Sequence, residues 1–108
     1  MGAALGTSAN TDILGNGSSS GKVLKINSVI VANVDGTNSA TVNVHFYDHD
    51  NTARYNIAHA VTVPAGSTLV VLGKDSPIYL EEGDQIEASA SAASDLEMII
   101  SYEELDDA

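Results

Sequence analysis

Short apolar runs, separated by residues that favour turns, extend through residues 23–105 of the chain. Pro64 and Gly66 favour one turn, because proline fixes φ and glycine accepts positive φ. Gly83 favours a second turn in the same way. The runs around these turns have the length and composition of strands. The pattern predicts strands at residues 68–72, 78–80, 86–92 and 96–102.

The first long run, residues 23–34, alternates with a period of two, as a strand with one buried face does. The alternation predicts that Leu24 and Ile30 both face the core. Val29 and Val31 then interrupt the polar face and form an apolar stripe that a monomer would leave in water. Closed symmetry is the usual way to cover such a stripe, so both valines are candidate contacts between copies, unless a loop of the same chain covers them.

Two more strands are expected after a turn at residues 35–38. The first covers residues 40–48, where apolar and polar residues alternate clearly, and the second covers residues 54–63. For residues 40–48 we expect an apolar inner face and a polar outer face. The inner face consists of Val42, Val44 and Phe46, and the outer face of Thr41, Asn43, His45 and Tyr47.

This array predicts an all-β fold with a single domain over residues 22–108. Seven or eight antiparallel strands are typical of a β-sandwich with jelly-roll or related Greek-key topology. Residues 89–96 have some helical potential, but the Ala/Ser alternation from residue 88 to residue 92 favours a strand. With one Phe, four Tyr and no Trp, the core must be aliphatic, which favours thin, closely spaced sheets over a large pocket.

Residues 1–21 differ from the rest because glycine and serine dominate them. This composition is typical of a flexible segment, and we expect an N-terminal arm. Leu5, Ile13 and Leu14 are its candidate anchors on a partner, because a plain spacer has no use for large apolar side chains. The alternative, that Ile13 and Leu14 belong to a short first strand of the same domain, stays open.

The chain is strongly acidic, with fifteen Asp and Glu against four Lys and Arg and a formal net charge of −11. Such a surface repels phosphate backbones, so the composition argues against nucleic-acid binding. The late acidic residues predict either a solvated rim or a patch that docks on a basic partner. They are Glu81, Glu82, Asp84, Glu87, Asp95, Glu97, Glu103, Glu104, Asp106 and Asp107.

The sequence offers no motif for catalysis or membrane insertion. It has no cysteine, and no apolar run approaches the roughly 18–20 residues that a bilayer requires. The N-terminal residues do not predict a secretory signal. There is no G-x-S-x-G motif and no phosphate-binding glycine loop, and the adjacent carboxylates of Glu81 and Glu82 lie in a polar context. We therefore expect a protein that is not an enzyme, needs no cofactor and contacts no membrane.

The densest polar chemistry lies in residues 45–51, which combine two imidazoles, two carboxylates and an amide. Asp48, Asp50 and Asn51 are candidate ligands for a hard cation such as Ca²⁺, which prefers several oxygens in a flexible loop. The other ligands of a helix-flanked calcium loop are missing, and the two histidines diverge at this spacing. The alternative is an ordinary turn in which Asp and Asn side chains bind the neighbouring chain.

Several of these turn and strand segments resemble a recurring pattern in small β-sandwich virion structural proteins of tailed bacteriophages. The matching pieces are residues 63–69 (VPAGSTL), 80–86 (LEEGDQI), 88–93 and 101–105, with looser similarity at residues 26–33 and 55–61. The resemblance implies a structural role in the virus particle, on the outer capsid surface after assembly in the host cytoplasm. Among the cement-like members of this group, trimers are the expected form.

Two classes of function follow from this reading. The first is a capsid decoration (cement) protein that binds and clamps neighbouring subunits of the major capsid protein, with the arm and the acidic residues making the contact. The second is a neck, tail or tail-fibre-associated module, structural or dedicated to recognising a receptor such as a host glycan. Glycan sites use exposed aromatic platforms, and only Tyr47, Tyr55, Tyr79 and Tyr102 are candidates, so the composition favours the first class.

Overall fold

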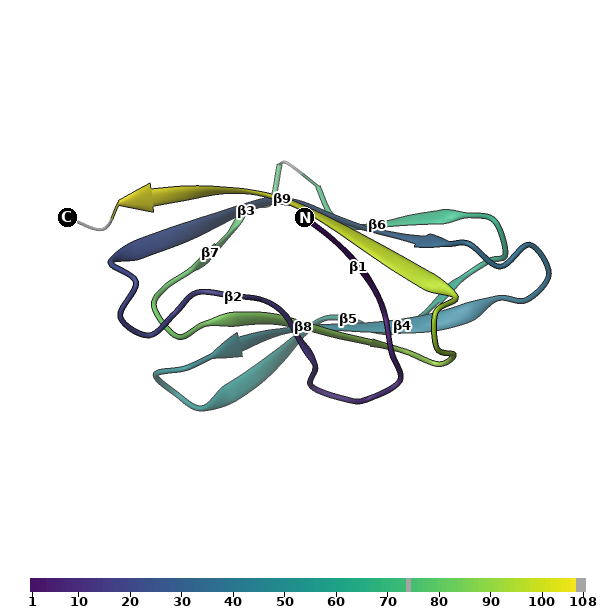
Figure 1. The fold of residues 1–108 in the computed structure, drawn as a ribbon, viewed down its shortest axis with the longest axis horizontal. Helices are drawn as coiled ribbons and strands as arrows, with labels where there is room; N and C mark the ends of the chain where they lie inside the picture. The colour runs from purple at the N-terminus through teal and green to yellow at the C-terminus, as the bar shows by residue number, and fades with distance from the viewer. Residues whose placement is uncertain (74, 107–108) are drawn as a thin grey trace.

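The computed structural model describes residues 1–73 and 75–106 and contains two antiparallel sheets packed as a sandwich (Figure 1). Over these residues there is no helix, which confirms the predicted all-β sandwich. In the same part of the chain, no helix is long and apolar enough to cross a membrane. Asp107 of the predicted acidic rim lies outside the described residues. The strands are β1 (Gly2–Ala4), β2 (Asp12–Gly15), β3 (Lys22–Asn33), β4 (Ala40–Asp48), β5 (Ala53–Val63), β6 (Thr68–Leu72), β7 (Ile78–Leu80), β8 (Gln85–Ala90) and β9 (Leu96–Asp106).

The strand order is that of a jelly roll. One sheet has the order β1-β9-β3-β6, with β7 also paired to β3, and the other has the order β2-β8-β4-β5. Because β6 and β7 pair with different stretches of β3, they act as two halves of one interrupted strand. With β6 and β7 counted together, eight strands remain, and every connection except the β4–β5 hairpin crosses from one sheet to the other. The sequence predicts both of these pieces as strands, at residues 68–72 and 78–80, so the ninth strand beyond the predicted seven or eight is β1, which lies in the segment expected to be a flexible arm.

The N-terminal segment supplies one edge strand to each sheet, so it is not a free arm. β1 pairs with β9 in the first sheet and β2 pairs with β8 in the second (Figure 1). Leu5, between the two strands, is 1% exposed, and Ile13 and Leu14 pack against the same core. The expectation that these three residues anchor a free arm on a partner is therefore corrected: Leu5 is buried in the domain's own core, and Ile13 and Leu14 are partly buried against it.

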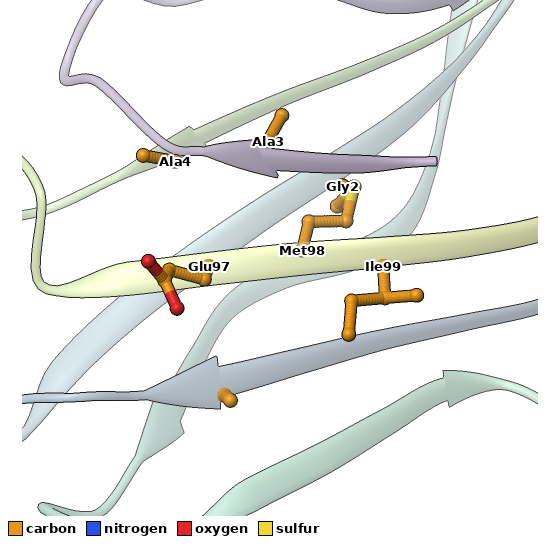
Figure 2. Close-up of a pocket in the computed structure, with 7 residues that line it drawn as sticks. Gly2, Ala3, Ala4, Glu97, Met98 and Ile99 are labelled. Carbon is orange, nitrogen blue, oxygen red and sulfur yellow. The ribbon is translucent and has the colours of Figure 1, made fainter.

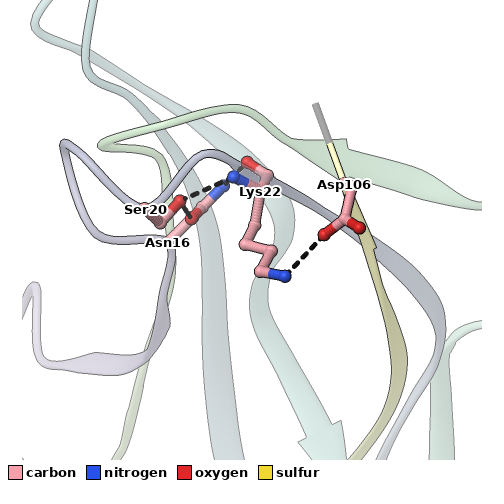
Figure 3. Close-up of polar contacts among 4 residues, drawn as sticks. All are labelled: Asn16, Ser20, Lys22 and Asp106. Carbon is pink, nitrogen blue, oxygen red and sulfur yellow. Dashed lines mark hydrogen bonds and ion pairs between the residues drawn. The ribbon is translucent and has the colours of Figure 1, made fainter. Parts of the chain in front are cut away.

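Asn16 holds the end of this segment in place (Figure 3). It is 5% exposed, and its side-chain Nδ2 donates hydrogen bonds to the carbonyl oxygens of Lys22 at 2.8 Å and Leu80 at 2.9 Å. Its Oδ1 accepts a hydrogen bond from Ser20 Oγ at 2.6 Å. Next to it, the Lys22 ammonium pairs with the carboxylate of Asp106 across β3 and β9. A glycine- and serine-rich stretch is thus ordered by one buried amide whose polar atoms are all satisfied.

A β-bulge on β3 decides which of its side chains are buried. The register between β3 and β9 shifts between Ile26 and Ser28, which leaves Asn27 as an extra residue without a partner on β9. One extra residue turns every later side chain to the opposite face of the sheet. Val29 and Val31 are therefore fully buried, and the prediction that they form a wet stripe for contacts between copies is wrong.

The core between the sheets is aliphatic, and the four-stranded sheet contributes to it as predicted. Val42 and Val44 are fully buried and Phe46 packs against them from the same face of β4. Ile86 and the small side chains of Ala88 and Ala90 cover the core from β8. Full burial of one Val, Leu or Ile stabilises a fold by about 1.5–3 kcal/mol, so these side chains fix the orientation of the sheet and hence the side chains on its outer face.

Candidate functional site

The outer face of the five-stranded sheet carries exposed apolar side chains. Ile30 of β3 has Ile99 of β9 as its cross-strand partner on one side and Val70 of β6 on the other. Ile99 is 50% exposed and Val70 is 62% exposed, with Ile30 partly buried between them. We call Ile99, Ile30 and Val70 the apolar row. Val34, which is 55% exposed, follows the end of β3.

A shallow pocket of about 340 Å³ opens beside the apolar row (Figure 2). The pocket exists because the residues around Glu97 and Ile99 are small. Gly2 and Ala4 on β1 are the cross-strand partners of Ile99 and Glu97, respectively, and Ala32 on β3 is the other partner of Glu97. We call these five residues the socket. Figure 2 shows Glu97 and Ile99 on β9, which runs between β1 and β3, so the socket joins an exposed carboxylate to an apolar wall.

The outer face of the four-stranded sheet carries polar side chains in the corresponding place. Asp12 of β2, Glu87 of β8, His45 of β4 and Asn56 of β5 are successive cross-strand partners, and we call them the polar row. The side chain of Glu87 is only 2% exposed. Its two carboxylate oxygens accept hydrogen bonds from Nε of Arg54 at 2.7 Å and from Nη2 of Arg54 at 3.5 Å.

The charged side chains of the polar row interact with one another and with Arg54. Partial burial, together with the nearby charge of Glu87, raises the pKa of Asp12. The hydrogen bond to Glu87 raises the pKa of Arg54, whose guanidinium carbon also lies 4.8 Å from the centre of the Tyr47 ring. Among the described side chains, Nδ1 of His45 is buried without a hydrogen-bond partner. A carboxylate held in this way by a guanidinium supports the sheet.

The predicted cation loop forms a turn between β4 and β5. Nδ2 of Asn51 donates a hydrogen bond to Oδ2 of Asp48 at 2.7 Å, as side chains in such turns commonly do. Asp50 instead lines a shallow polar depression with Glu81 and Glu82. Within residues 1–73 and 75–106, no group of three or more His, Cys, Asp or Glu could hold a metal ion. The structure thus joins Asp48 to Asn51 as turn partners and gives no ligand set.

Two members of the predicted acidic rim are buried. Glu87 belongs to the polar row, and Asp84 is 5% exposed. The Asp84 carboxylate accepts hydrogen bonds from the backbone N–H groups of His49 and Glu81, each at 3.0 Å, and so stabilises the turn before β8. The solvated part of the rim is therefore smaller than the sequence predicts.

The four tyrosines lie in different surroundings. Tyr55 on β5 and Tyr79 on β7 are 55% and 50% exposed, but they belong to different sheets. Tyr47 lies under the guanidinium of Arg54, and Tyr102 packs against the core. The structure therefore does not gather the candidate aromatic platforms into one site.

Sequence alone points to the right strand for the exposed apolar surface but to the wrong residues. Simple alternation places Ile30 inside and Val29 outside, whereas the bulge reverses both. The polar pair Asn27-Ser28 in the middle of an apolar run is the one signal of the bulge that the sequence contains. A scan of protein-family models, a search of curated proteins and a search of solved structures each return no significant match to this chain.

Proposed function

We propose that this protein is a non-enzymatic structural protein of a tailed-phage virion, a capsid decoration (cement) protein that binds and clamps neighbouring major capsid subunits. The observation that carries the proposal is the apolar row, which lies exposed on the outer face of a sheet fixed by its own core. Contiguous apolar side chains on a sheet face are typical of surfaces that bind another protein. A rigid sandwich with such a face suits a role in attachment.

The segments that resemble phage virion proteins support the proposal through that resemblance, and two of them form turns of the fold. Residues 63–69 turn the chain into β6, with Gly66 at a φ of 70°. Residues 80–86 turn the chain into β8, with Gly83 at a φ of 88°. A Cβ atom on Gly83 would lie 2.5 Å from Cγ of His49, so both the backbone conformation and the packing require glycine there.

Charge supports a partner with a basic surface. The net charge of −11 favours fast association with a positively charged shell and adds sensitivity to salt. Val29 and Val31 are buried and cannot be the predicted contacts between copies, so the proposed trimer rests on the resemblance alone. The proposed partner is therefore the major capsid protein, and the oligomeric state is a separate question for experiment.

The copy number of the protein in purified virions tests the proposal. A decoration protein covers the shell, so quantitative gel densitometry should give a ratio to the major capsid protein near stoichiometric. Sedimentation with purified shells that lack the protein should remove it from the supernatant at low salt. Failure to find the protein in virions, together with failure to sediment with shells, would refute a virion role.

A second candidate function is a neck, tail or tail-fibre-associated module, structural or dedicated to receptor recognition. The exposed Tyr55 and Tyr79 favour it, because accessible aromatic rings are the usual platforms for sugars. Copy number separates the two candidates, since a neck or tail component is present in far fewer copies than the capsid subunit. Glycan-array binding that disappears on Tyr55→Ala or Tyr79→Ala would support the recognition module over the cement protein.

A further inference from the structure

We infer that the outer face of the five-stranded sheet is the docking surface, and that its partner inserts a Lys or Arg side chain into the socket while apolar side chains of the same partner cover the apolar row. The inference deepens the proposed function and rests on it for the identity of the partner, a basic surface of the major capsid protein. It rests on the structure for the chemistry of the contact.

The socket has the features that a long basic side chain needs. Its walls are the small side chains of Ala4 and Ala32, the backbone of Gly2 and the apolar flank of Ile99. Lys and Arg carry apolar stems, and such stems pack along surfaces of this kind while the charged head stays near water. Glu97 lies at the socket with an exposed carboxylate that has no ion pair among the described residues. The socket therefore offers both the apolar wall and the counter-charge.

Charge also argues against a second copy of this chain as the partner. Of the basic side chains that the structure describes, Lys22 pairs with Asp106 and Arg54 pairs with Glu87. Lys25 lies opposite Glu103 on the neighbouring strand. A second copy would thus bring its own large negative charge to the socket and offer few cations to neutralise Glu97. A basic partner satisfies the carboxylate without this cost.

The chain provides matched control positions on the same strand and the same face. Glu103 lies on β9, is exposed like Glu97 and projects from the same face, but lies beyond the socket. Leu105, which is 40% exposed, is the corresponding control for Ile99. The test compares Glu97→Gln with Glu103→Gln, and Ile99→Thr with Leu105→Thr. Far-ultraviolet circular dichroism and urea unfolding of all four variants show that each is folded.

The first measurement uses shells of the major capsid protein and the sedimentation assay. Loss of one ion pair or one buried apolar side chain at an interface corresponds to about a tenfold change in Kd, so we expect Glu97→Gln and Ile99→Thr each to weaken binding about tenfold. We expect Glu103→Gln and Leu105→Thr to bind within about twofold of the unsubstituted chain, as changes at the rim of an interface usually do. Equal losses at Glu97 and Glu103 would mean that only overall charge matters and would overturn the inference.

The second measurement does not depend on the capsid. A short synthetic peptide that alternates lysine and valine is titrated into the isotope-labelled protein and followed by NMR, with a peptide that alternates glutamate and valine as the control. We expect shifts of the Ile99, Ile30 and Val70 methyl signals with the lysine peptide alone. Shifts with both peptides, or shifts spread over the acidic surface, would overturn the inference. Dimerisation of the free protein through the apolar row would assign the face to a second copy and would also overturn it.

The two measurements separate the inference from the proposed function. If shells fail to bind while the lysine peptide maps to the socket, the capsid partner is wrong and the docking chemistry stands. If shells bind and the Glu97 and Ile99 variants bind equally well, the capsid role stands and the docking surface lies elsewhere.

Discussion

The two outer faces of this sandwich differ in the side chains that cross their centres. Across the middle of the five-stranded sheet lie Ile99, Ile30 and Val70, which expose apolar atoms to water. Across the middle of the four-stranded sheet lies the polar row, in which the carboxylate of Glu87 is buried and bound to Arg54. On the polar face, the Glu87 carboxylate accepts its hydrogen bonds from Arg54 of the same chain. On the apolar face, the side chains of the apolar row are exposed and available to a partner.

Under the proposed docking role, polarity alone is a poor guide to a binding face. Buried charge with an internal partner contributes to the structure of one chain, and its removal destabilises the fold. Exposed apolar side chains contribute little to the fold and gain most when a second molecule covers them. We therefore regard the face with the buried ion pair as structural, and we propose docking for the face that carries the apolar row and Glu97.

The bulge on β3 creates the apolar face, and its removal is the strongest way to break the comparison. Deletion of Asn27 would restore simple alternation and turn Val29 and Val31 toward water. The loss of two fully buried valines costs roughly 3–6 kcal/mol, a large share of the roughly 5–15 kcal/mol that stabilises a domain, so we expect the variant to unfold at a much lower urea concentration. The matched control is Asn27→Ser, which keeps the residue count and should unfold close to the unsubstituted protein in urea. A stable, cooperative deletion variant would show that the bulge does not set the register.

The N-terminal segment borders both faces, because β1 adjoins the socket and β2 adjoins the polar row. Leu5 directly follows β1 and is 1% exposed. We expect Leu5→Ala to lower the free energy of unfolding by about 3 kcal/mol, as large-to-small changes in a core do. Leu105→Ala should change it by less than about 0.5 kcal/mol, since that side chain is exposed. A free arm would instead make both changes equally mild, as measured by urea denaturation.

The ion pair on the polar face gives the next largest effect. Arg54→Met would leave the carboxylate of Glu87 buried without its partner, which we expect to cost about 2 kcal/mol. In a Glu87→Gln background the same change should cost much less, because no charge is left behind. A double-mutant cycle in urea measures this coupling. Equal costs in both backgrounds would assign the effect to the packing of Arg54 over Tyr47.

Much of the fold could be predicted from local pattern, because alternation and turn chemistry act over a few residues. β4 shows the predicted faces, and the turn at Pro64 and Gly66 precedes β6 as expected. The features that were missed depend on distant partners. Burial of Glu87 requires Arg54, which lies 33 residues away in sequence. Ordering of the first residues requires Asn16 to reach Leu80, 64 residues away.

The candidate surface was missed for a similar reason. The polar pair Asn27-Ser28 indicates an irregularity on β3, but only the pairing with β9 shows that Asn27 is the extra residue. The identity of Glu97 as the carboxylate in the socket depends on Gly2, Ala4 and Ala32, which come from two other strands. Neither fact can be read from the period of the hydrophobic pattern, which reports one strand at a time.

The smallest expected effect concerns the pH dependence of the polar row. Because burial and Glu87 raise the pKa of Asp12 in the folded state, the folded protein holds this proton more tightly than the unfolded chain does. The contribution to stability is complete below the ordinary value of 3.8 and is lost as the pH rises through the raised pKa. At pH 7 the charged Asp12 is therefore unfavourable, and we expect Asp12→Asn to stabilise the protein by less than about 1 kcal/mol, since the side chain is largely solvated.

Asp106→Asn is the matched control of opposite sign, because Lys22 lowers the pKa of Asp106 and the substitution removes a favourable charge at neutral pH. Urea denaturation of both variants at pH 7 and pH 3 should give a gain for Asp12→Asn and a loss for Asp106→Asn at pH 7, with both differences shrinking at pH 3. A loss of stability for Asp12→Asn at pH 7 would show that Asp12 is a favourable partner in the polar row and not a source of repulsion.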